Sequence, residues 1–322
     1  TYMKKILIIG SGAMGAAFTF PCLDNNNKVT ITEPYSKKFI KDLTSKDKFH
    51  SALKVKLSKK LKFRKFSRDL LKENFDLIVI ALSLSGIDFV GEELKNHKNK
   101  TPILVLTKGL KYEKRGKKIL TIPEQLTKKY KLMNVSILKG PCLAKELARK
   151  QQTSVIIANK NIIIAKFIGK MISTKYYLTE YSRDVTGIEV CSAIKNIYAM
   201  IIGAGQSLNS SSNLFQKSIL EMKYLIKYFK GKDETILGLA GVGDLYVSAA
   251  GGRNSKMGSY LGKGFTFKTA KKRFMPNDTV EGEQLAKEIA IFIYKKVDKR
   301  KIPLMINLLK TIMSNKKLKI KV

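Results

Sequence analysis

The chain has 322 residues, 44% of them hydrophobic, which is enough for two domains with cores of their own. Lysine and arginine total 62 against 25 acidic residues, a formal net charge of +37, and such a charge raises nucleic acid or an anionic membrane surface as partners. The lysines are scattered along the whole chain and arginine is scarce. We therefore expect a compositional preference for lysine and no specific nucleic-acid partner.

Three cysteines, Cys22, Cys142 and Cys191, lie far apart with no C-x-x-C pair and no histidine beside them. This spacing indicates neither a disulfide framework nor a metal site, and it fits a reducing cytoplasm. The apolar stretch near the start is broken by glycines too soon for a signal peptide. No later run reaches the roughly 20 apolar residues that span a bilayer, so we expect a soluble cytoplasmic protein without a transmembrane segment.

The first predicted strand, residues 5–9, runs into a glycine-rich turn that opens a helix. The first glycine permits the tight turn, the second lets backbone N–H groups approach a pyrophosphate, and the third lets helix and strand pack closely. This pattern predicts a dinucleotide site made by Gly10, Ser11, Gly12, Ala13, Met14 and Gly15. A plain strand-to-helix turn is the alternative interpretation.

The second predicted strand, residues 28–32, ends in Glu33. An acid at this place can accept hydrogen bonds from the adenosine ribose hydroxyls and repels a 2′-phosphate. We therefore expect NAD as the cofactor. Lys37 and Lys38 follow closely, so NADP stays open.

The rest of the first half continues the alternation of short β-branched runs with amphipathic stretches, which is typical of βαβ units. Further strands are predicted at residues 77–81, 103–107, 136–139 and 154–158, and helices at residues 187–202, 214–229, 280–294 and 303–313. The sequence thus predicts an α/β fold. An N-terminal Rossmann-type, doubly wound sheet over residues 1–184 is followed by an all-α C-terminal domain over residues 185–322.

The helix predicted after residue 187 carries a polar stripe on an otherwise apolar surface. At 100° per residue, Glu189, Ser192, Lys195 and Asn196 fall within roughly a third of its circumference. A buried lysine is costly unless it faces a cleft, and neighbouring cations would disfavour its charged form and make it a readier proton donor. A lysine that snorkels to solvent along its stem is the alternative.

Residues 238–254 form a glycine-rich segment with an acid at Asp244 and an arginine at Arg253. Small residues let the backbone come close to a ligand, and the fork of an arginine suits a phosphate. A solvated arginine in a turn is the alternative. His50 and His97 lie in lysine-rich stretches and are expected on the surface, so lysine is left as the acid and base.

Taken in order, these segments resemble the NAD(P)-dependent glycerol-3-phosphate dehydrogenases over nearly the whole chain. The motifs that carry the resemblance are the glycine turn, Thr107-Lys108-Gly109-Leu110, Gly140-Pro141 with Ala144-Lys145-Glu146, residues 184–189 leading into Ala193-Ile194-Lys195-Asn196, residues 239–245, Gly251-Gly252-Arg253-Asn254, and Val280-Glu281-Gly282.

The resemblance implies hydride transfer between NAD(P)H and dihydroxyacetone phosphate, giving sn-glycerol 3-phosphate, a phospholipid precursor. It implies that Lys195 is the general acid and base, that Asp244 orients it, and that Lys108 binds near the reacting carbonyl. Substrate hydroxyls would meet Asn196 and Ser248, and the phosphate would meet Arg253 and Asn254. The cofactor would contact Ala144, Arg253 and Glu281.

Three departures from the family pattern leave the substrate open: Leu82 replaces a proline, the loop over residues 204–209 is short, and Lys217 replaces an arginine. One alternative is therefore the same chemistry on another phosphorylated or acidic small ketone. An alternative of another class is a nucleotide-sensing or nucleic-acid-binding protein without catalysis, which would bind nucleic acid with a steep salt dependence. A homodimer is left open.

Overall fold

The computed structural model describes residues 3–95 and 101–320, which fold as two compact units. The first unit is formed from the chain up to residue 108 and from residues 122–185. The second is formed from residues 109–121 and from residues 186 onward. Residues 109–121 therefore belong with the second unit. The single boundary at residue 184 that was expected from the sequence would place them in the first.

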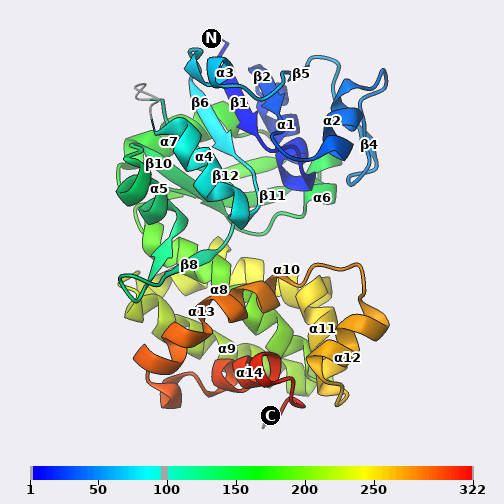
Figure 1. Ribbon diagram of the computed structural model, residues 1–322, viewed down its shortest axis with the longest axis vertical. Helices are drawn as coiled ribbons and strands as arrows, with labels where there is room; N and C mark the ends of the chain where they lie inside the picture. Colours follow the sequence, from blue (N-terminus) through cyan, green and yellow to red (C-terminus); the bar gives the residue numbers. More distant parts are fainter. Residues whose placement is uncertain (1–2, 96–100, 321–322) are drawn as a thin grey trace. The chain divides into compact units, whose positions relative to one another are not determined.

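The first unit (Figure 1) is built on an eight-stranded sheet in the order β12-β11-β10-β7-β6-β1-β2-β5. Neighbouring strands are parallel except β10 and β11, which pair antiparallel. All six predicted strands are present, and the first two have the predicted bounds. The strands are β1 Lys5–Ile9, β2 Lys28–Thr32, β5 Lys62–Phe63, β6 Leu77–Ile80, β7 Ile103–Val105, β10 Val135–Lys139, β11 Thr153–Ala158 and β12 Tyr177–Ser182.

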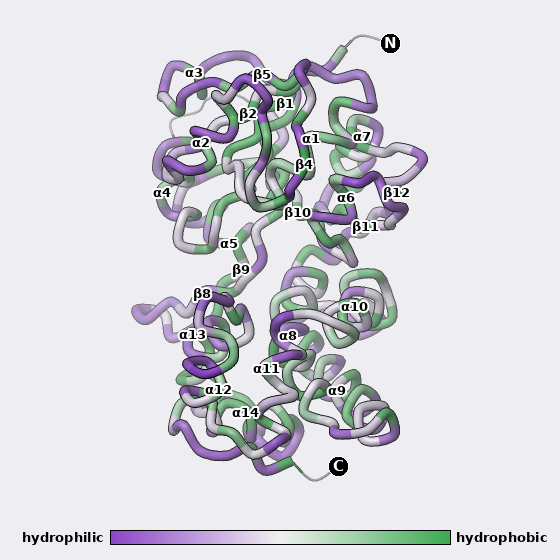
Figure 2. The backbone as a smooth tube through the Cα atoms, turned by 90° about the vertical axis from the view of Figure 1, so that its right-hand side faces the viewer, coloured by the Kyte–Doolittle hydropathy of each residue, from purple (hydrophilic) through white to green (hydrophobic). Residues whose placement is uncertain are grey.

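Helices cover both faces of this sheet. Figure 2 shows α4 and α5 on one side and α1, α6 and α7 on the other. Strands covered on both faces read as continuous apolar runs, and Ile6, Leu7, Ile8 and Ile9 of β1 are all 0% exposed. The Rossmann-type prediction is confirmed. The helices are α1 Ala13–Asp24, α2 Lys37–Thr44, α3 Arg68–Lys72, α4 Ile87–Leu94, α5 Ile122–Tyr130, α6 Ala144–Ala148 and α7 Ile162–Ile172, and a small hairpin joins β3 Phe49–His50 to β4 Val55–Lys56.

The second unit is helical and also contains the hairpin of β8 and β9. Its four longest helices, α8, α9, α13 and α14, were all predicted. The elements are β8 Leu110–Glu113, β9 Lys118–Thr121, α8 Val185–Gly203, α9 Leu208–Tyr228, α10 Asp244–Gly251, α11 Arg253–Gly262, α12 Phe267–Phe274, α13 Glu281–Lys296 and α14 Pro303–Ser314, with short helical turns η2 Asp233–Leu237, η3 Leu239–Gly243 and η4 Lys299–Lys301.

Helix α8 is the core of this unit. It is long and apolar enough to cross a membrane by length and composition, but 94% of that window is buried inside the protein, as expected for a core helix that is apolar nearly all round. Helix α9 begins earlier than the predicted residue 214 because Ser207 and Ser210 form a capping box, which satisfies backbone N–H groups at its start.

Candidate active site

The amine of Lys195, in the middle of α8, is buried against two side chains of α10. Its Nζ donates to Oδ1 of Asp244 and, at 2.7 Å, to Oγ of Ser248. The Lys195 and Asp244 side chains are only 6% and 3% exposed. The alternative of a lysine that snorkels to solvent is therefore wrong, and the carboxylate balances the buried ammonium charge.

Helix α10 presents both partners of Lys195 on one face, because Asp244 is its first residue and Ser248 follows one turn later. The glycine-rich turn η3 leads into it and contains Gly241, whose backbone is not helical. A Cβ at Gly241 would lie 1.9 Å from the carbonyl oxygen of Ile236. At this position the small residue thus serves close packing within the chain, whereas the sequence suggested room for a ligand.

Next to Lys195 on α8, Asn196 joins a second set of polar side chains around Glu281. The Asn196 amide donates to one Glu281 carboxylate oxygen at 3.1 Å, and the Arg253 guanidinium donates to the other at 3.3 Å. The Asn254 side-chain oxygen accepts from the Gly282 N–H at 2.8 Å. Residues predicted from three separate segments of the sequence are thus brought together by α8, α11 and α13.

Arg253 and Asn254 open helix α11, whose N-cap is Gly252 and has no side-chain cap. An uncapped helix N-terminus offers backbone N–H groups and a partial positive charge to an anion. The Arg253 side chain is 52% exposed, so its guanidinium is both accessible and paired with a carboxylate. This differs from the alternative of a solvated arginine in a turn, and the arrangement suits a phosphate.

In the first unit, the glycine turn has the geometry that a dinucleotide needs. Gly10 has a φ of +105°, and a Cβ there would lie 2.5 Å from the Ala81 carbonyl oxygen. A Cβ at Gly15 would lie 2.1 Å from the Gly10 carbonyl oxygen, whereas one at Gly12 meets nothing within 4 Å. Gly12 is also the uncapped N-cap of α1. The open space therefore lies where a pyrophosphate would approach.

The carboxylate of Glu33 makes four hydrogen bonds within the first unit. One oxygen accepts from the N–H of Ser11 at 2.7 Å and from its hydroxyl at 2.8 Å, and the other accepts from the N–H groups of Tyr35 and Ser36 at 2.9 and 3.1 Å. Glu33 is 6% exposed. Its carboxylate therefore fixes the glycine turn to the end of β2, a role that the sequence did not indicate.

The expectation that His50 lies on the surface is wrong. Its side chain is 0% exposed, its Nε2 lies 2.8 Å from the Ser11 carbonyl oxygen, and its ring stacks on Phe39 with centroids 5.0 Å apart. His50 thus contacts the backbone of the glycine turn. The charged residues around it in the sequence concealed this role. His97 lies outside the described residues.

Lys108 and Ala144 both belong to the first unit. Lys108 is half-buried and follows Thr107, whose hydroxyl donates to the Leu82 carbonyl oxygen at 2.7 Å. The Thr107 carbonyl oxygen accepts from Nζ of Lys139, a lysine only 1% exposed. Sequence reasoning missed Lys139, although a lysine that ends an apolar strand was a usable signal. Ala144 is half-buried at the start of α6.

A doubly wound sheet with an open glycine turn, together with a helical unit that buries a lysine against an aspartate, defines the class of nicotinamide-dependent dehydrogenases with two structural units. Residues 5–165 match the N-terminus of NAD-dependent glycerol-3-phosphate dehydrogenase, and residues 184–322 match its C-terminus. The chain therefore belongs to the NAD-dependent glycerol-3-phosphate dehydrogenase family.

Individual relatives agree with this membership. The NADP(+)-dependent glycerol-3-phosphate dehydrogenase of Archaeoglobus fulgidus is 30% identical over 82% of each chain. The glycerol-3-phosphate dehydrogenase [NAD(P)+] of Phytoplasma australiense is 31% identical over 81% of this chain and 80% of its own. Among solved structures, the Coxiella burnetii glycerol-3-phosphate dehydrogenase has a TM-score of 0.84 at 23% identity, over 98% of this chain and 97% of its own. The enzyme from Saccharomyces cerevisiae has a TM-score of 0.85 at 20% identity, over 98% of each chain, and these two likenesses concern the fold.

Proposed function

We propose that this chain is a glycerol-3-phosphate dehydrogenase, which interconverts dihydroxyacetone phosphate and sn-glycerol 3-phosphate with NAD(P)H. The observation that carries the proposal is the buried Lys195, held by Asp244 and Ser248, in a chain that belongs to this enzyme family. The relatives named above bear the name of this activity.

Lys195 serves as the general acid in the reduction. The nicotinamide, when bound, supplies the hydride that adds to the carbonyl carbon of the substrate. As negative charge grows on the carbonyl oxygen, the Lys195 ammonium donates a proton to it. In the reverse direction the Lys195 amine takes the hydroxyl proton. Asp244 holds the Lys195 amine in place and balances its charge. Ser248 accepts a hydrogen bond from the same amine, and its hydroxyl can also bond a substrate hydroxyl.

Arg253 and Asn254 bind the substrate phosphate at the start of α11. The Arg253 guanidinium must then leave Glu281, and this exchange is easy because both side chains of the pair are about half exposed, at 52% and 48%. Ion pairs of that kind contribute only about 0–1 kcal/mol. Binding of the phosphate far from the reacting carbon supplies the energy that positions the carbonyl. Lys108 near the carbonyl and Asn196 at a hydroxyl complete the substrate contacts.

The glycine turn, Ala144, Arg253 and Glu281 hold the cofactor, and Glu33 favours NADH over NADPH. The open space at Gly12 supports cofactor binding at the glycine turn, and the acid at the end of β2 supports the preference for NADH. Because Glu33 already accepts four hydrogen bonds, a ribose hydroxyl must share or replace one of them. We expect a higher kcat/KM for NADH than for NADPH, measured side by side, and equal values would remove the assigned preference.

A second candidate keeps the chemistry and changes the substrate to another small phosphorylated or acidic ketone. The connection between α8 and α9 favours it, because only residues 204–207 separate the two helices. The test is a panel of phosphorylated and acidic ketones at one NADH concentration, followed by absorbance. The proposal holds if dihydroxyacetone phosphate has the highest kcat/KM, and the second candidate replaces it if another ketone is far better.

A cytoplasmic location and a homodimer complete the proposal. None of the three cysteines, all within the described residues, is in a disulfide, which supports a reducing compartment. Fractionation of cells and light scattering on the purified protein test the two statements separately.

A further inference from the structure

A cavity of about 670 Å³ lies in the second unit between α9, η4, α14 and the segment that follows α14. Its apolar lining includes Leu220, Leu304 and Ile320. Leu220 is 56% exposed, which is unusual for a leucine in a concave site. The cavity shares no residue with the cluster around Lys195.

Three lysines from three different elements surround this apolar lining: Lys217 of α9, Lys301 of η4 and Lys319 after α14. Within the described part of the chain, none of the three makes an ion pair. Asp298, which is near Lys301 in sequence, pairs instead with Arg300 at 3.0 Å. The cavity therefore combines an apolar wall with three lysines that make no ion pair of their own in the described residues.

The acid that also lines the cavity, Glu221, makes its bonds to neutral groups of the protein and forms no ion pair with these lysines in the described residues. Its carboxylate accepts from the N–H groups of Leu304 and Met305 at 2.7 and 3.1 Å and from the hydroxyl of Tyr198 at 2.9 Å. Burial raises the pKa of Glu221 above its ordinary value, which disfavours its ionised form. Glu221 is thus bonded to the protein at the base of the cavity, and the lysines are left for a ligand.

We propose that this cavity binds a single-chain amphiphilic anion. The hydrocarbon chain lies against Leu220, Leu304 and Ile320, and a carboxylate or phosphate head group meets the lysines. An apolar wall gains from burying the chain, and lysines that make no ion pair within the described part of the protein gain from a counter-ion. The inference does not depend on the proposed dehydrogenase activity.

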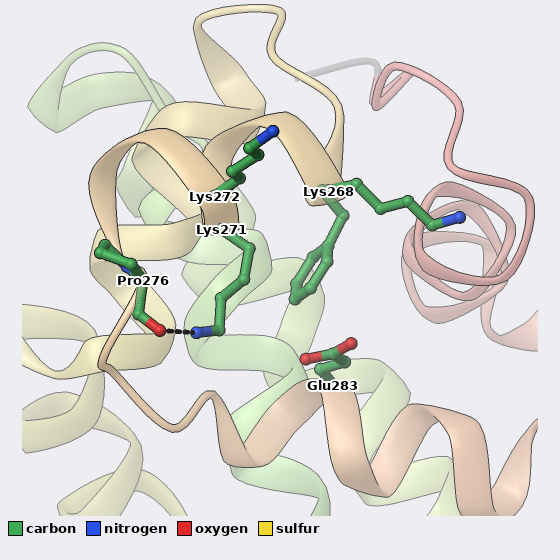
Figure 3. A pocket seen from close by; sticks show the side chains of 6 residues that line it. Lys268, Lys271, Lys272, Pro276 and Glu283 are labelled. Atoms are coloured by element: carbon green, nitrogen blue, oxygen red, sulfur yellow. Dashed lines mark hydrogen bonds between the residues drawn. The ribbon is translucent and has the colours of Figure 1, made fainter.

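Lysines are common on this protein, so a second lysine-lined hollow serves as the comparison. Figure 3 shows that hollow, of about 420 Å³, beside α12. Its Lys271 amine donates to the carbonyl oxygens of Met275 and Pro276 at 2.7 and 3.0 Å, and its wall includes the carboxylate of Glu283. Lys268 and Lys272 there provide matched positions for removing charge.

The test is isothermal titration calorimetry at low salt, with decanoate and decyl phosphate as probes and decanol and acetate as controls. For the wild-type chain we expect one site per chain for at least one of the two anions, and at least tenfold weaker binding of both controls. Lys301→Glu with Lys319→Glu should weaken binding at least about tenfold, since two attractive charges become repulsive. Lys268→Glu with Lys272→Glu changes the net charge equally and should change binding less than about twofold.

Binding of only decanoate or only decyl phosphate supports the proposal and identifies the head group. The proposal is overturned if neither anion binds at millimolar concentration, if decanol binds as tightly as the anions, or if both double variants weaken binding equally. It is also overturned if the Lys301 and Lys319 changes leave affinity unaltered and instead change the molar mass in light scattering, because the cavity would then be a protein contact. Leu220→Gln, at an exposed position that folding tolerates, should reduce affinity for decanoate while leaving the weak binding of acetate unchanged.

Discussion

Replacing Asp244 by asparagine keeps the shape of the side chain and removes its charge, so the buried Lys195 ammonium no longer faces the Asp244 carboxylate. Because the two side chains are 3% and 6% exposed, water cannot replace the carboxylate. Breaking one side of such a buried pair costs about 3–5 kcal/mol. Asparagine can still accept a hydrogen bond and Ser248 still contacts the amine, so we expect a loss of about 3 kcal/mol in the free energy of unfolding.

The double variant Lys195→Met with Asp244→Asn removes both charges, and it should lose less than about 2 kcal/mol because no unpaired ion remains. Asp69→Asn is the matched control: its pair with Lys72 has side chains 91% and 76% exposed, and its loss should stay below about 0.5 kcal/mol. Urea denaturation followed by circular dichroism measures all three. If Asp244→Asn costs no more than Asp69→Asn, or if the double variant is less stable than Asp244→Asn alone, the buried charge pair is refuted.

Three further predictions concern packing and reactivity. His50→Ala removes the ring that contacts the glycine turn and should weaken NADH binding about tenfold, measured by fluorescence; unchanged affinity would show that the turn holds itself. Gly258→Ala places a Cβ 1.9 Å from a backbone carbonyl oxygen of α8 and should lower the free energy of unfolding by about 1–3 kcal/mol or more. In the same urea titration Gly251→Ala, whose Cβ meets nothing within 4 Å, should be neutral or slightly stabilising. Burial raises the pKa of the Cys22 thiol far above its ordinary value, so iodoacetamide at pH 8 should modify the half-buried Cys142 first, and equal labelling by mass spectrometry would contradict this.

Local sequence patterns were sufficient to predict the strands and helices that are buried on all sides. The run at residues 5–9 and the helix around Lys195 are each covered by neighbours, so their sequences are mainly apolar. The edge strand β12 was missed because its burial varies along its length. Helices α10, α11 and α12 were missed because they are short, and the first two overlap the glycine-rich segment 238–254, which is typical of a loop.

The resemblance implied the residues of the candidate site and the contact of Lys195 with Asp244, but the other interactions were not predicted. Asn196 and Glu281 are 85 residues apart in the sequence, yet their side chains bond. Likewise the bond from Ser11 to Glu33 spans 22 residues. Pairings over such separations depend on how helices and strands pack, and a single sequence contains no signal for them. The glycine spacing of the turn at Gly10 and the helical periodicity around Lys195 are local features, and a single sequence is enough to recognise them.

The most direct test of the account is the turnover of dihydroxyacetone phosphate with NADH by the wild-type chain and by Lys195→Met. We predict NADH oxidation by the wild type and a loss of kcat of about 10²–10⁴-fold in the variant, with NADH binding and urea stability measured alongside to show that the fold and the cofactor site persist. The account is contradicted if the wild type binds NADH without turning over this substrate, or if the variant keeps the wild-type rate.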